Sequence, residues 1–184
     1  MDDIKQAIGA IKALRDGNYD EFKEVMAGLL LEVDPLKPFG TALFDSIARL
    51  SYNIAFEAVA LRKNPGTGKV EVYLRKRSMN DSAYPGEWHC PGTMIRPYEV
   101  PKDQAKRLEA EFGVKISNYR RITGIYTAES RGPVLSEVYL VELSGPPRED
   151  ESHLWFPVDA LPDTTVNIHR DLILPQALVH YHNI

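Results

Sequence analysis

The period of the hydrophobic residues changes once along this chain, near residue 52, and this change limits the folds that the chain can adopt. Before it, apolar residues recur every three or four positions, which is the spacing of one face of an α-helix. After it, apolar and polar residues alternate in short runs, as they do in half-buried strands. The sequence therefore predicts a helical extension over residues 1–51 and a strand-rich domain over residues 52–184.

Three helices are expected in the extension. Their apolar positions are Ile4, Ile8, Ile11 and Leu14 in the first, Phe22, Val25, Met26, Leu29 and Leu30 in the second, and Leu43, Phe44, Ile47 and Leu50 in the third. Gly17 is expected to end the first helix, and Pro35 and Pro38 the second. Each apolar face must be buried against something, which is either the rest of this chain, a second chain or a ligand.

The remainder is predicted to alternate strands with single helices. Strands are expected over residues 54–62, 70–76, 119–128, 134–143 and 155–157. A helix over residues 103–112 is closed by Gly113, and a last helix begins near Asn167 and is broken or kinked at Pro175. Residues 78–102 form a long loop rich in Pro and Gly, of a length typical of functional loops. This order indicates an α/β sandwich.

Two motifs carry most of the functional information. Trp88, Pro91 and Gly92 precede the helix of residues 103–112, and the segment 92–114 resembles the Nudix box, G-x5-E-x7-R-E-U-x-E-E-x-G-U, where U is aliphatic. Residues 155–162, Trp-Phe-Pro-Val-Asp-Ala-Leu-Pro, resemble W-F-x-x-D-E-L-P of the same family. The resemblance covers about residues 52–182. It implies a Nudix-like α/β/α sandwich with a mixed sheet, here carrying an N-terminal helical extension.

The loop part of the box departs from the family pattern when it is counted from Gly92. Thr93 stands where a second glycine is usual. Six positions after Gly92 comes Tyr98 and not the expected glutamate, and Glu99 follows one position later.

The helix part departs further. Lys106 takes the position of the arginine, Arg107 that of the next glutamate, and Ala110 that of the first glutamate in the final pair. Glu111 is the retained helix glutamate; Leu108, Gly113 and Val114 also match. In the family, glutamates on this helix bind divalent cations, which require several oxygen ligands. The resemblance therefore implies that Glu111 is a catalytic residue and metal ligand, but that a Mg²⁺ or Mn²⁺ site here is weak.

Arg107 puts a positive charge where the motif, counted from Gly92, has a glutamate. It shares a helix face with Asp103 and Glu111, at a spacing of four residues on either side. We hypothesise that Arg107 takes the place of the metal as a built-in cation and contacts a phosphate. The alternative is a ladder of solvent-exposed ion pairs.

Further acids are candidate metal ligands. Glu99 lies on the loop before the helix, and Glu129 and Glu137 flank the turn between two late strands, from which the family often takes another carboxylate. For each, the alternative is a solvated surface residue.

Further candidates for ligand binding surround the motif. Arg75 and Arg77 end a strand on one face, and with Arg96 in the loop they could bind a phosphate. Trp88 could stack on a base, and Gly92 belongs to the motif that leads into the box.

Composition excludes some classes of protein. A net charge of −4 over 184 residues argues against general nucleic-acid binding and against binding to a membrane surface. No apolar run approaches the roughly 20 residues that span a bilayer, and no signal peptide is recognised. Cys90, the single cysteine, excludes an internal disulfide, and as a neighbour of His89 it lacks the geometry of a nucleophile. A cytoplasmic protein is expected.

Three functions remain open. The first, which we prefer narrowly, is a domain that binds a nucleotide or another phosphorylated small molecule, with weak or absent pyrophosphohydrolase activity. The second is an active metal-dependent Nudix hydrolase of a nucleoside diphosphate derivative, which uses Glu111 and acids outside the box. The third is a structural or interaction protein that acts through the N-terminal helices, for example as a homodimer.

Overall fold

The computed structural model describes residues 2–34, 37–129 and 132–182. The chain forms two compact units, Met1–Phe39 and Gly40–Ile184. The third predicted helix, α3 (Thr41–Ala48), therefore lies in the larger unit, whereas the sequence-based division at residue 51 places it in the extension. No helix in the described ranges is long and apolar enough to span a membrane.

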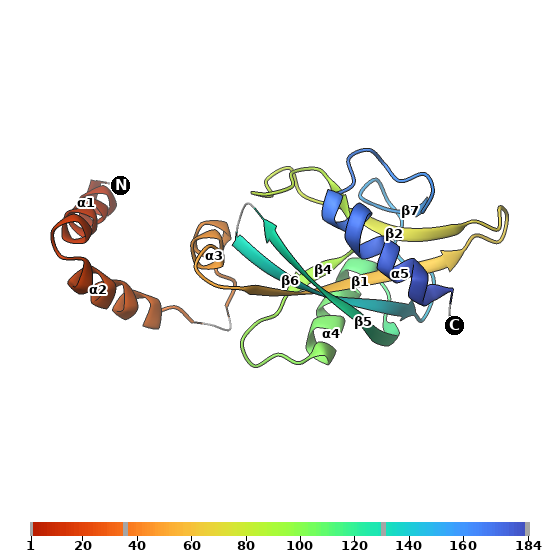
Figure 1. Ribbon diagram of the computed structural model, residues 1–184, viewed down its shortest axis with the longest axis horizontal. Helices are drawn as coiled ribbons and strands as arrows, with labels where there is room; N and C mark the ends of the chain where they lie inside the picture. Colours follow the sequence, from red (N-terminus) through yellow and green to blue (C-terminus); the bar gives the residue numbers. More distant parts are fainter. Residues whose placement is uncertain (1, 35–36, 130–131, 183–184) are drawn as a thin grey trace. The chain divides into compact units, whose positions relative to one another are not determined.

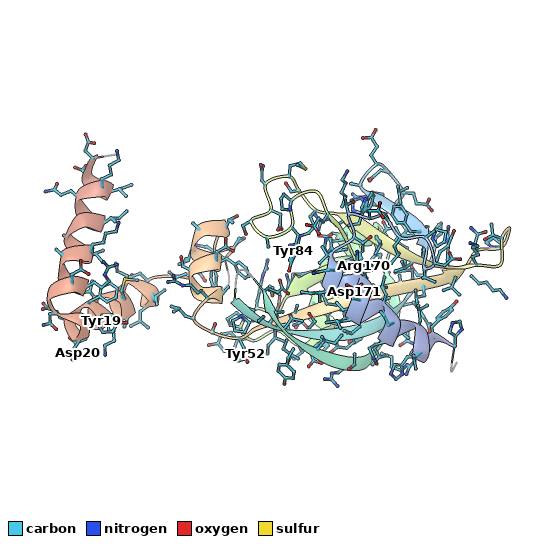
Figure 2. The ribbon with its side chains drawn as sticks, turned by 45° about the horizontal axis from the view of Figure 1, so that its top comes forward. Tyr19, Asp20, Tyr52, Tyr84, Arg170 and Asp171 are labelled. Atoms are coloured by element: carbon cyan, nitrogen blue, oxygen red, sulfur yellow. The ribbon has the colours of Figure 1, made fainter. Side chains whose placement is uncertain are left out.

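The smaller unit consists of two consecutive helices, α1 (Asp2–Gly17) and α2 (Tyr19–Leu31). Asn18 between them is the N-cap of α2, since its side chain accepts a hydrogen bond from the Glu21 amide at 3.3 Å. Figure 2 shows Tyr19 and Asp20 at the start of this helix. None of the described residues in either helix is buried. The apolar faces that the sequence predicts to be buried are therefore exposed or partly exposed in these two helices. Pro35, predicted to end the second helix, lies outside the described residues.

The larger unit is built on a mixed sheet. Its strands in the described residues are β1 (Asn53–Lys63), β2 (Val70–Lys76), β3 (Trp88–His89), β4 (Gly92–Met94), β5 (Ile116–Glu129), β6 (Gly132–Leu143) and β7 (His153–Pro157). Their order is β3-β2-β1-β6-β5, with β4 paired to β1 and β7 to β2. The β1–β6 pair is parallel and the other pairs are antiparallel.

Two helices cover opposite faces of this sheet (Figure 1). Under α4 (Pro101–Phe112) lies one core cluster, which includes Phe56, Tyr73, Leu108 and Phe112. Under α5 (Leu174–Tyr181) lies the other, which includes Val59, Leu74, Ile173 and Ala177. The alternation predicted for residues 70–76 is confirmed, because Leu74 and Tyr73 enter different clusters. The α/β/α sandwich with a mixed sheet is thereby confirmed.

The last helix is not broken at its proline. A π-helical turn, η1 (His169–Ile173), runs directly into α5, and Pro175 lies in the first turn of α5. Pro175 thus stands where the helix changes from the π-helical turn to the α-helix.

The long segment 78–102 is not only a loop. It contains β3 and β4, which are too short to show a hydrophobic period. β3 pairs with the end of β2, so that His89 lies opposite Arg75. β4 pairs with β1, so that Gly92 lies opposite Glu57 and Thr93 opposite Phe56. These two strands place the motif residues between β1, β2 and α4.

Helix α4 begins and ends at recognisable signals. Pro101 is in its first turn, and the Val100 amide donates a hydrogen bond to Asp103 Oδ2 at 3.0 Å. Gly113 closes the helix in the left-handed conformation, with φ of 69°, as predicted.

Candidate functional site

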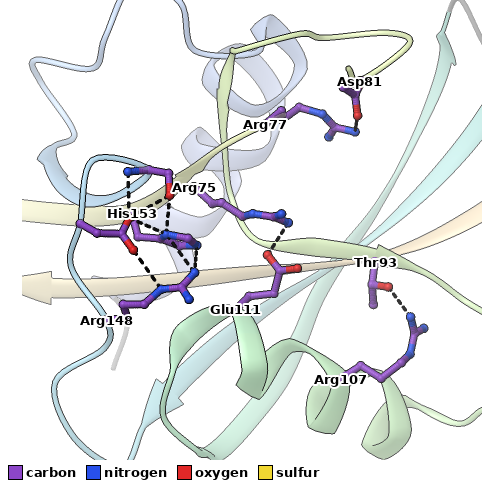
Figure 3. A network of polar contacts seen from close by, with 10 residues as sticks. Arg75, Arg77, Asp81, Thr93, Arg107, Glu111, Arg148 and His153 are labelled. Carbon is purple, nitrogen blue, oxygen red and sulfur yellow. Dashed lines mark hydrogen bonds and ion pairs between the residues drawn. The ribbon is translucent and has the colours of Figure 1, made fainter. Parts of the chain in front are cut away.

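Arg107 of α4 holds the loop that leads into its own helix. Its guanidinium donates to Thr93 Oγ1 at 2.6 Å, to the Met94 carbonyl at 2.8 Å and to Glu99 Oε2 at 2.7 Å. Figure 3 shows the contact between Arg107 and Thr93. The alternative reading, a ladder of Arg107 with Asp103 and Glu111, is not what these contacts form, and a contact of Arg107 with a phosphate stays a prediction.

Glu99 is fixed from two sides. Its Oε2 also accepts the Arg96 amide at 2.9 Å. Burial of Glu99 favours its neutral form, but the hydrogen bonds from the Arg96 amide and from Arg107 outweigh burial and lower the pKa of the carboxyl. Glu99 is thus an ionised partner of Arg107, and it is engaged in holding the loop.

This pairing changes how the box is counted. Glu99 and Arg107 are eight positions apart, which is the E-x7-R spacing of the motif. Counted from Glu99, the box begins at Thr93 and Arg107 is its arginine, so the count from Gly92 was displaced by one position. From Arg107 to Gly113 the helix has one residue fewer than the motif. The departure from the family pattern is therefore concentrated after Arg107.

Glu111 also has an arginine partner. Arg75 of β2 forms an ion pair with Glu111 Oε2, and their side chains are 34% and 26% exposed (Figure 3). Next along the chain, Arg77 contacts Asp81 Oδ2 at 2.6 Å. Burial of Asp81 opposes ionisation, but Arg77 and the Tyr84 and Ala83 amides outweigh it and lower the pKa of Asp81 to about 2.

The side chains do not fit the divalent cation that the resemblance implies. Glu99 and Glu111 are each paired with an arginine, and Glu137 is paired with Arg121. Within residues 2–34, 37–129 and 132–182, no group of three His, Cys, Asp or Glu side chains is placed to hold a metal ion. Since a hard divalent cation requires several oxygen ligands, these acids do not form a metal site in this arrangement.

A cavity of about 110 Å³ is lined in part by Arg77. Its walls come from α3, β1, β3, β4, β5, β6, η1 and the segments after β2 and before η1, and include Phe44, Glu57, Arg77, Tyr84, His89, Gly92, Thr93, Glu129, Ser136, Ile168 and His169. Four of its polar side chains are buried, with exposures of 9% or less: Glu57, His89, Ser136 and His169. The cavity is therefore small, and buried polar side chains share its walls with apolar ones.

Gly92 has a defined role beside this cavity. A Cβ atom there would collide with the carboxylate of Glu57, the residue opposite in β1. A larger residue at this position would therefore have to displace the Glu57 side chain.

The two buried histidines of the cavity wall, His89 and His169, are neutral. Burial lowers the pKa of His89 well below its ordinary value, and the nearby His169, Arg77 and Arg75 lower it further. Burial, together with Arg77, lowers the pKa of His169 to about 3. His169 Nδ1 accepts the Cys90 amide at 3.3 Å, which leaves the ring proton on Nε2. Uncharged imidazoles beside a carboxylate are suited to a polar, uncharged group of a ligand.

Cys90 does not provide a nucleophile. The residue is fully buried, and burial together with the nearby Glu57 raises the pKa of its thiol. The reactive thiolate is therefore disfavoured.

The other predicted site residues are dispersed. Trp88 is buried against Phe156, with ring centroids 4.9 Å apart, so it belongs to the core and presents no face to a ligand. Arg96 is exposed in the loop. Glu129 lines the cavity, whereas Glu137 on β6 forms an ion pair with Arg121. Of the predicted site residues, the structure thus places Arg77, Gly92 and Glu129 at the cavity, and it pairs Arg75 with Glu111 and Arg107 with Glu99.

Four cavity residues were not predicted as site residues: Glu57, His89, Ser136 and His169. For Glu57 the sequence held a signal, because it is an acid inside the apolar run of residues 54–61. A buried acid in a central strand requires a specific reason. The others give no comparable signal, since their proximity depends on β3 and on the π-helical turn.

Comparison with known proteins connects this architecture to a fold. No protein-family model matches the chain, and no curated protein matches it. Among solved structures, a mutT/nudix family protein from Listeria innocua is 20% identical, with a TM-score of 0.58 over 73% of this chain and 96% of that chain. The NUDIX domain of Shewanella oneidensis NrtR complexed with ADP ribose is 18% identical, with a TM-score of 0.56 over 84% and 97%.

The match to the longer NrtR chain from Shewanella oneidensis is partial. It is 17% identical with a TM-score of 0.58, and it covers 71% of this chain but 63% of that chain. NrtR has also been solved in complex with a 27mer DNA. At these identities the likeness establishes the fold and nothing finer.

Proposed function

We propose that this chain, which has the Nudix fold, binds a nucleotide derivative or another phosphorylated small molecule and hydrolyses it weakly or not at all. The observation that carries the proposal is the pairing of the acids. Glu99 is engaged by Arg107 and Glu111 by Arg75, so neither is free to bind a cation without first losing an arginine. Positive side chains next to a cavity with polar side chains in its walls are what a phosphorylated ligand requires.

His89 connects Arg75 to the cavity, because it is paired with Arg75 in the sheet and also lines the cavity. This residue lies opposite Arg75 in the β2–β3 pair, and its ring is 5.6 Å from that of His169 in the cavity wall. A phosphate at the arginines would therefore place the rest of the ligand at the cavity entrance. The ADP ribose complex of the NrtR domain, a protein of the same fold, supports this class of ligand.

The test combines binding and turnover. Purified protein is titrated with ADP-ribose, NADH, nucleotide sugars, dinucleoside polyphosphates and nucleoside triphosphates, each with Mg²⁺, with Mn²⁺ and with EDTA. We expect at least one ligand to raise the melting temperature in EDTA, because a ligand at 100 times its Kd stabilises the folded state by about 2.7 kcal/mol. We expect little phosphate release.

Glu111→Gln is the control for activity. Metal-dependent turnover that disappears in Glu111→Gln would make the chain an active hydrolase and overturn the proposal. Absence of binding to every ligand, in protein shown to be folded, would overturn it as well.

One observation favours a second candidate, an interaction role for the N-terminal helices. Large apolar side chains of α1 and α2 are exposed, including Ile4, Ile8, Leu29, Leu30 and Leu31. Faces of this kind are typical of helices that bind a partner. The test is the mass of the full chain in solution, compared with that of Ile8→Lys; a dimer that this substitution dissociates would support the role.

The expectation that the chain does not bind nucleic acid generally can also be tested. We propose that the chain does not bind DNA generally, given its net charge of −4. A mobility-shift assay with a duplex of mixed sequence checks this, and a shift at physiological salt would contradict it.

A further inference from the structure

We propose that Glu111 is an internal anion that occupies Arg75 in the free protein and is displaced by a phosphoryl group of the ligand. In this reading Arg75 is the phosphate-binding residue, and Glu111 is neither a metal ligand nor a general base. The inference rests on the proposed function, since it names how the same site receives its ligand.

The position of Arg75 is preset by the sheet. Its strand, β2, is paired on one side with β3 and on the other with β7, so that Arg75 lies opposite both His89 and His153. His153 is itself held by Asp150 at 2.8 Å and by Arg148 (Figure 3). The guanidinium therefore extends from a rigid backbone, as binding residues require.

The Arg75 guanidinium has fewer polar contacts than that of Arg107. Arg107 makes three hydrogen bonds and Arg77 makes one to Asp81. In the described part of the chain the Arg75 side chain shows one polar contact, the ion pair between its Nη1 and Glu111 Oε2. Arg75 is thus held by a single carboxylate, and an anion that makes more contacts with the guanidinium can replace it.

A phosphoryl group is such an anion. The guanidinium is a planar fork with five N–H donors, and it binds two phosphate oxygens at once. The contact to Glu111 uses one terminal nitrogen, Nη1. Both side chains are about a third exposed, so a ligand reaches them from solvent. Exchange of a singly held carboxylate for a doubly held phosphate therefore needs no change in the fold.

The site also lies on the way to the cavity. His89 lines the cavity, and it is close enough to Arg75 and Arg77 for their charges to lower the pKa of its ring. A phosphate on Arg75 would then lie between the helix α4 and the cavity wall, with Arg77 on the same side of the strand end.

This inference and a metal-ligand role predict opposite effects of one substitution. Removal of the Glu111 charge frees Arg75, so Glu111→Gln should bind inorganic pyrophosphate and ADP-ribose about two- to fivefold more tightly than the wild type in EDTA, because a partly exposed ion pair opposes binding by up to about 1 kcal/mol. Arg75→Gln should lose binding, and the double variant should show no gain over Arg75→Gln. Binding is measured by calorimetry.

Two controls make the result specific. Glu142→Gln removes one negative charge on β6 away from the site, and its affinity should equal that of the wild type. Melting curves establish that each variant is folded.

Two further measurements test the role of Arg75 itself. Arg75→Lys keeps the charge but loses the planar guanidinium, so it should bind with intermediate affinity. In the unmodified protein, the NMR signal of Arg75 Nε should shift when pyrophosphate is added without metal.

The possible outcomes distinguish the internal anion from a metal-ligand role of Glu111, and they test the proposed function separately. Equal or weaker binding by Glu111→Gln, or Mg²⁺-enhanced binding that only this substitution abolishes, would overturn the inference. If the wild type binds its nucleotide ligand and Glu111→Gln binds it equally, the proposed function stands and the internal anion is wrong. If the wild type binds nothing while Glu111→Gln binds pyrophosphate through Arg75, the internal anion stands and the proposed function is wrong.

Discussion

At the scale of single residues, a buried acid explains a glycine of the motif. Glu57 lies in β1 with 9% exposure, and its carboxylate fills the space that a side chain at position 92 would need. The motif glycine is thus constrained by packing in this chain, whether or not it also approaches a ligand.

Gly92→Ala is therefore expected to lower the free energy of unfolding by about 1–3 kcal/mol, the usual cost of overpacking. Urea denaturation measures this change. Gly66→Ala is the matched control, because a Cβ there meets only an ordinary contact at 3.5 Å. Equal stability of Gly92→Ala and wild type would mean that the Glu57 carboxylate moves away at little cost.

Asp81 should make stability depend on acid pH. Its pKa is about 2 in the folded protein, below the value of 3.8 for an unperturbed aspartate. A depressed pKa contributes stability that is present above the unfolded value and is lost as the pH falls through the folded value. Discounted for solvent screening, the contribution is on the order of 1 kcal/mol.

The measurement is the free energy of unfolding between pH 5 and 2 for wild type and Asp81→Asn. We expect a shallower loss of stability in the variant over roughly pH 4 to 2. Parallel curves would show that Arg77 does not hold the ionised carboxylate.

At the scale of elements, Arg107 connects helix α4 to the loop before it. Three hydrogen bonds to Thr93, Met94 and Glu99 tie the first strand residues of the motif to the middle of the helix. Removal of a half-buried partner leaves an acid and a carbonyl without their donor.

We expect Arg107→Ala to lower the free energy of unfolding by about 2–4 kcal/mol. Amides of residues 94–100 should exchange with deuterium faster in the variant. Arg170→Ala is the control, since Arg170 forms an exposed pair with Asp171 (Figure 2) and should cost less than about 0.5 kcal/mol. A change no larger than that of Arg170→Ala would contradict the structural role.

The elements also show what sequence patterns predict. Strand 70–76 and the end of α4 at Gly113 were predicted at the observed residues, because alternation and a helix-ending glycine are local signals. β3 and β4 were missed, because strands of two and three residues have no period. The partner of Arg107 was mispredicted from helix spacing, although the eight-residue separation from Glu99 was present in the sequence.

At the scale of the whole molecule, stability is distributed unevenly. The core clusters lie on the two faces of the sheet, while no described residue of α1 or α2 is buried. Helices of this length are marginal in water without packing.

We therefore expect amide exchange in α1 and α2 to be near that of an unfolded chain, and amides of β1 and β6 to be strongly protected. Hydrogen–deuterium exchange followed by mass spectrometry measures both. Strong protection of α1 at micromolar protein that is lost on dilution would instead indicate that a second copy covers the helices.

The pairing of each arginine with a carboxylate also has a kinetic consequence. Arg75, Arg77 and Arg107 are balanced by Glu111, Asp81 and Glu99, so the entrance has little net charge of its own. An anionic molecule that diffuses towards it is neither drawn in nor repelled over a distance. Its association rate should then change little with ionic strength, and selection among anions would take place through dissociation, after the molecule has arrived.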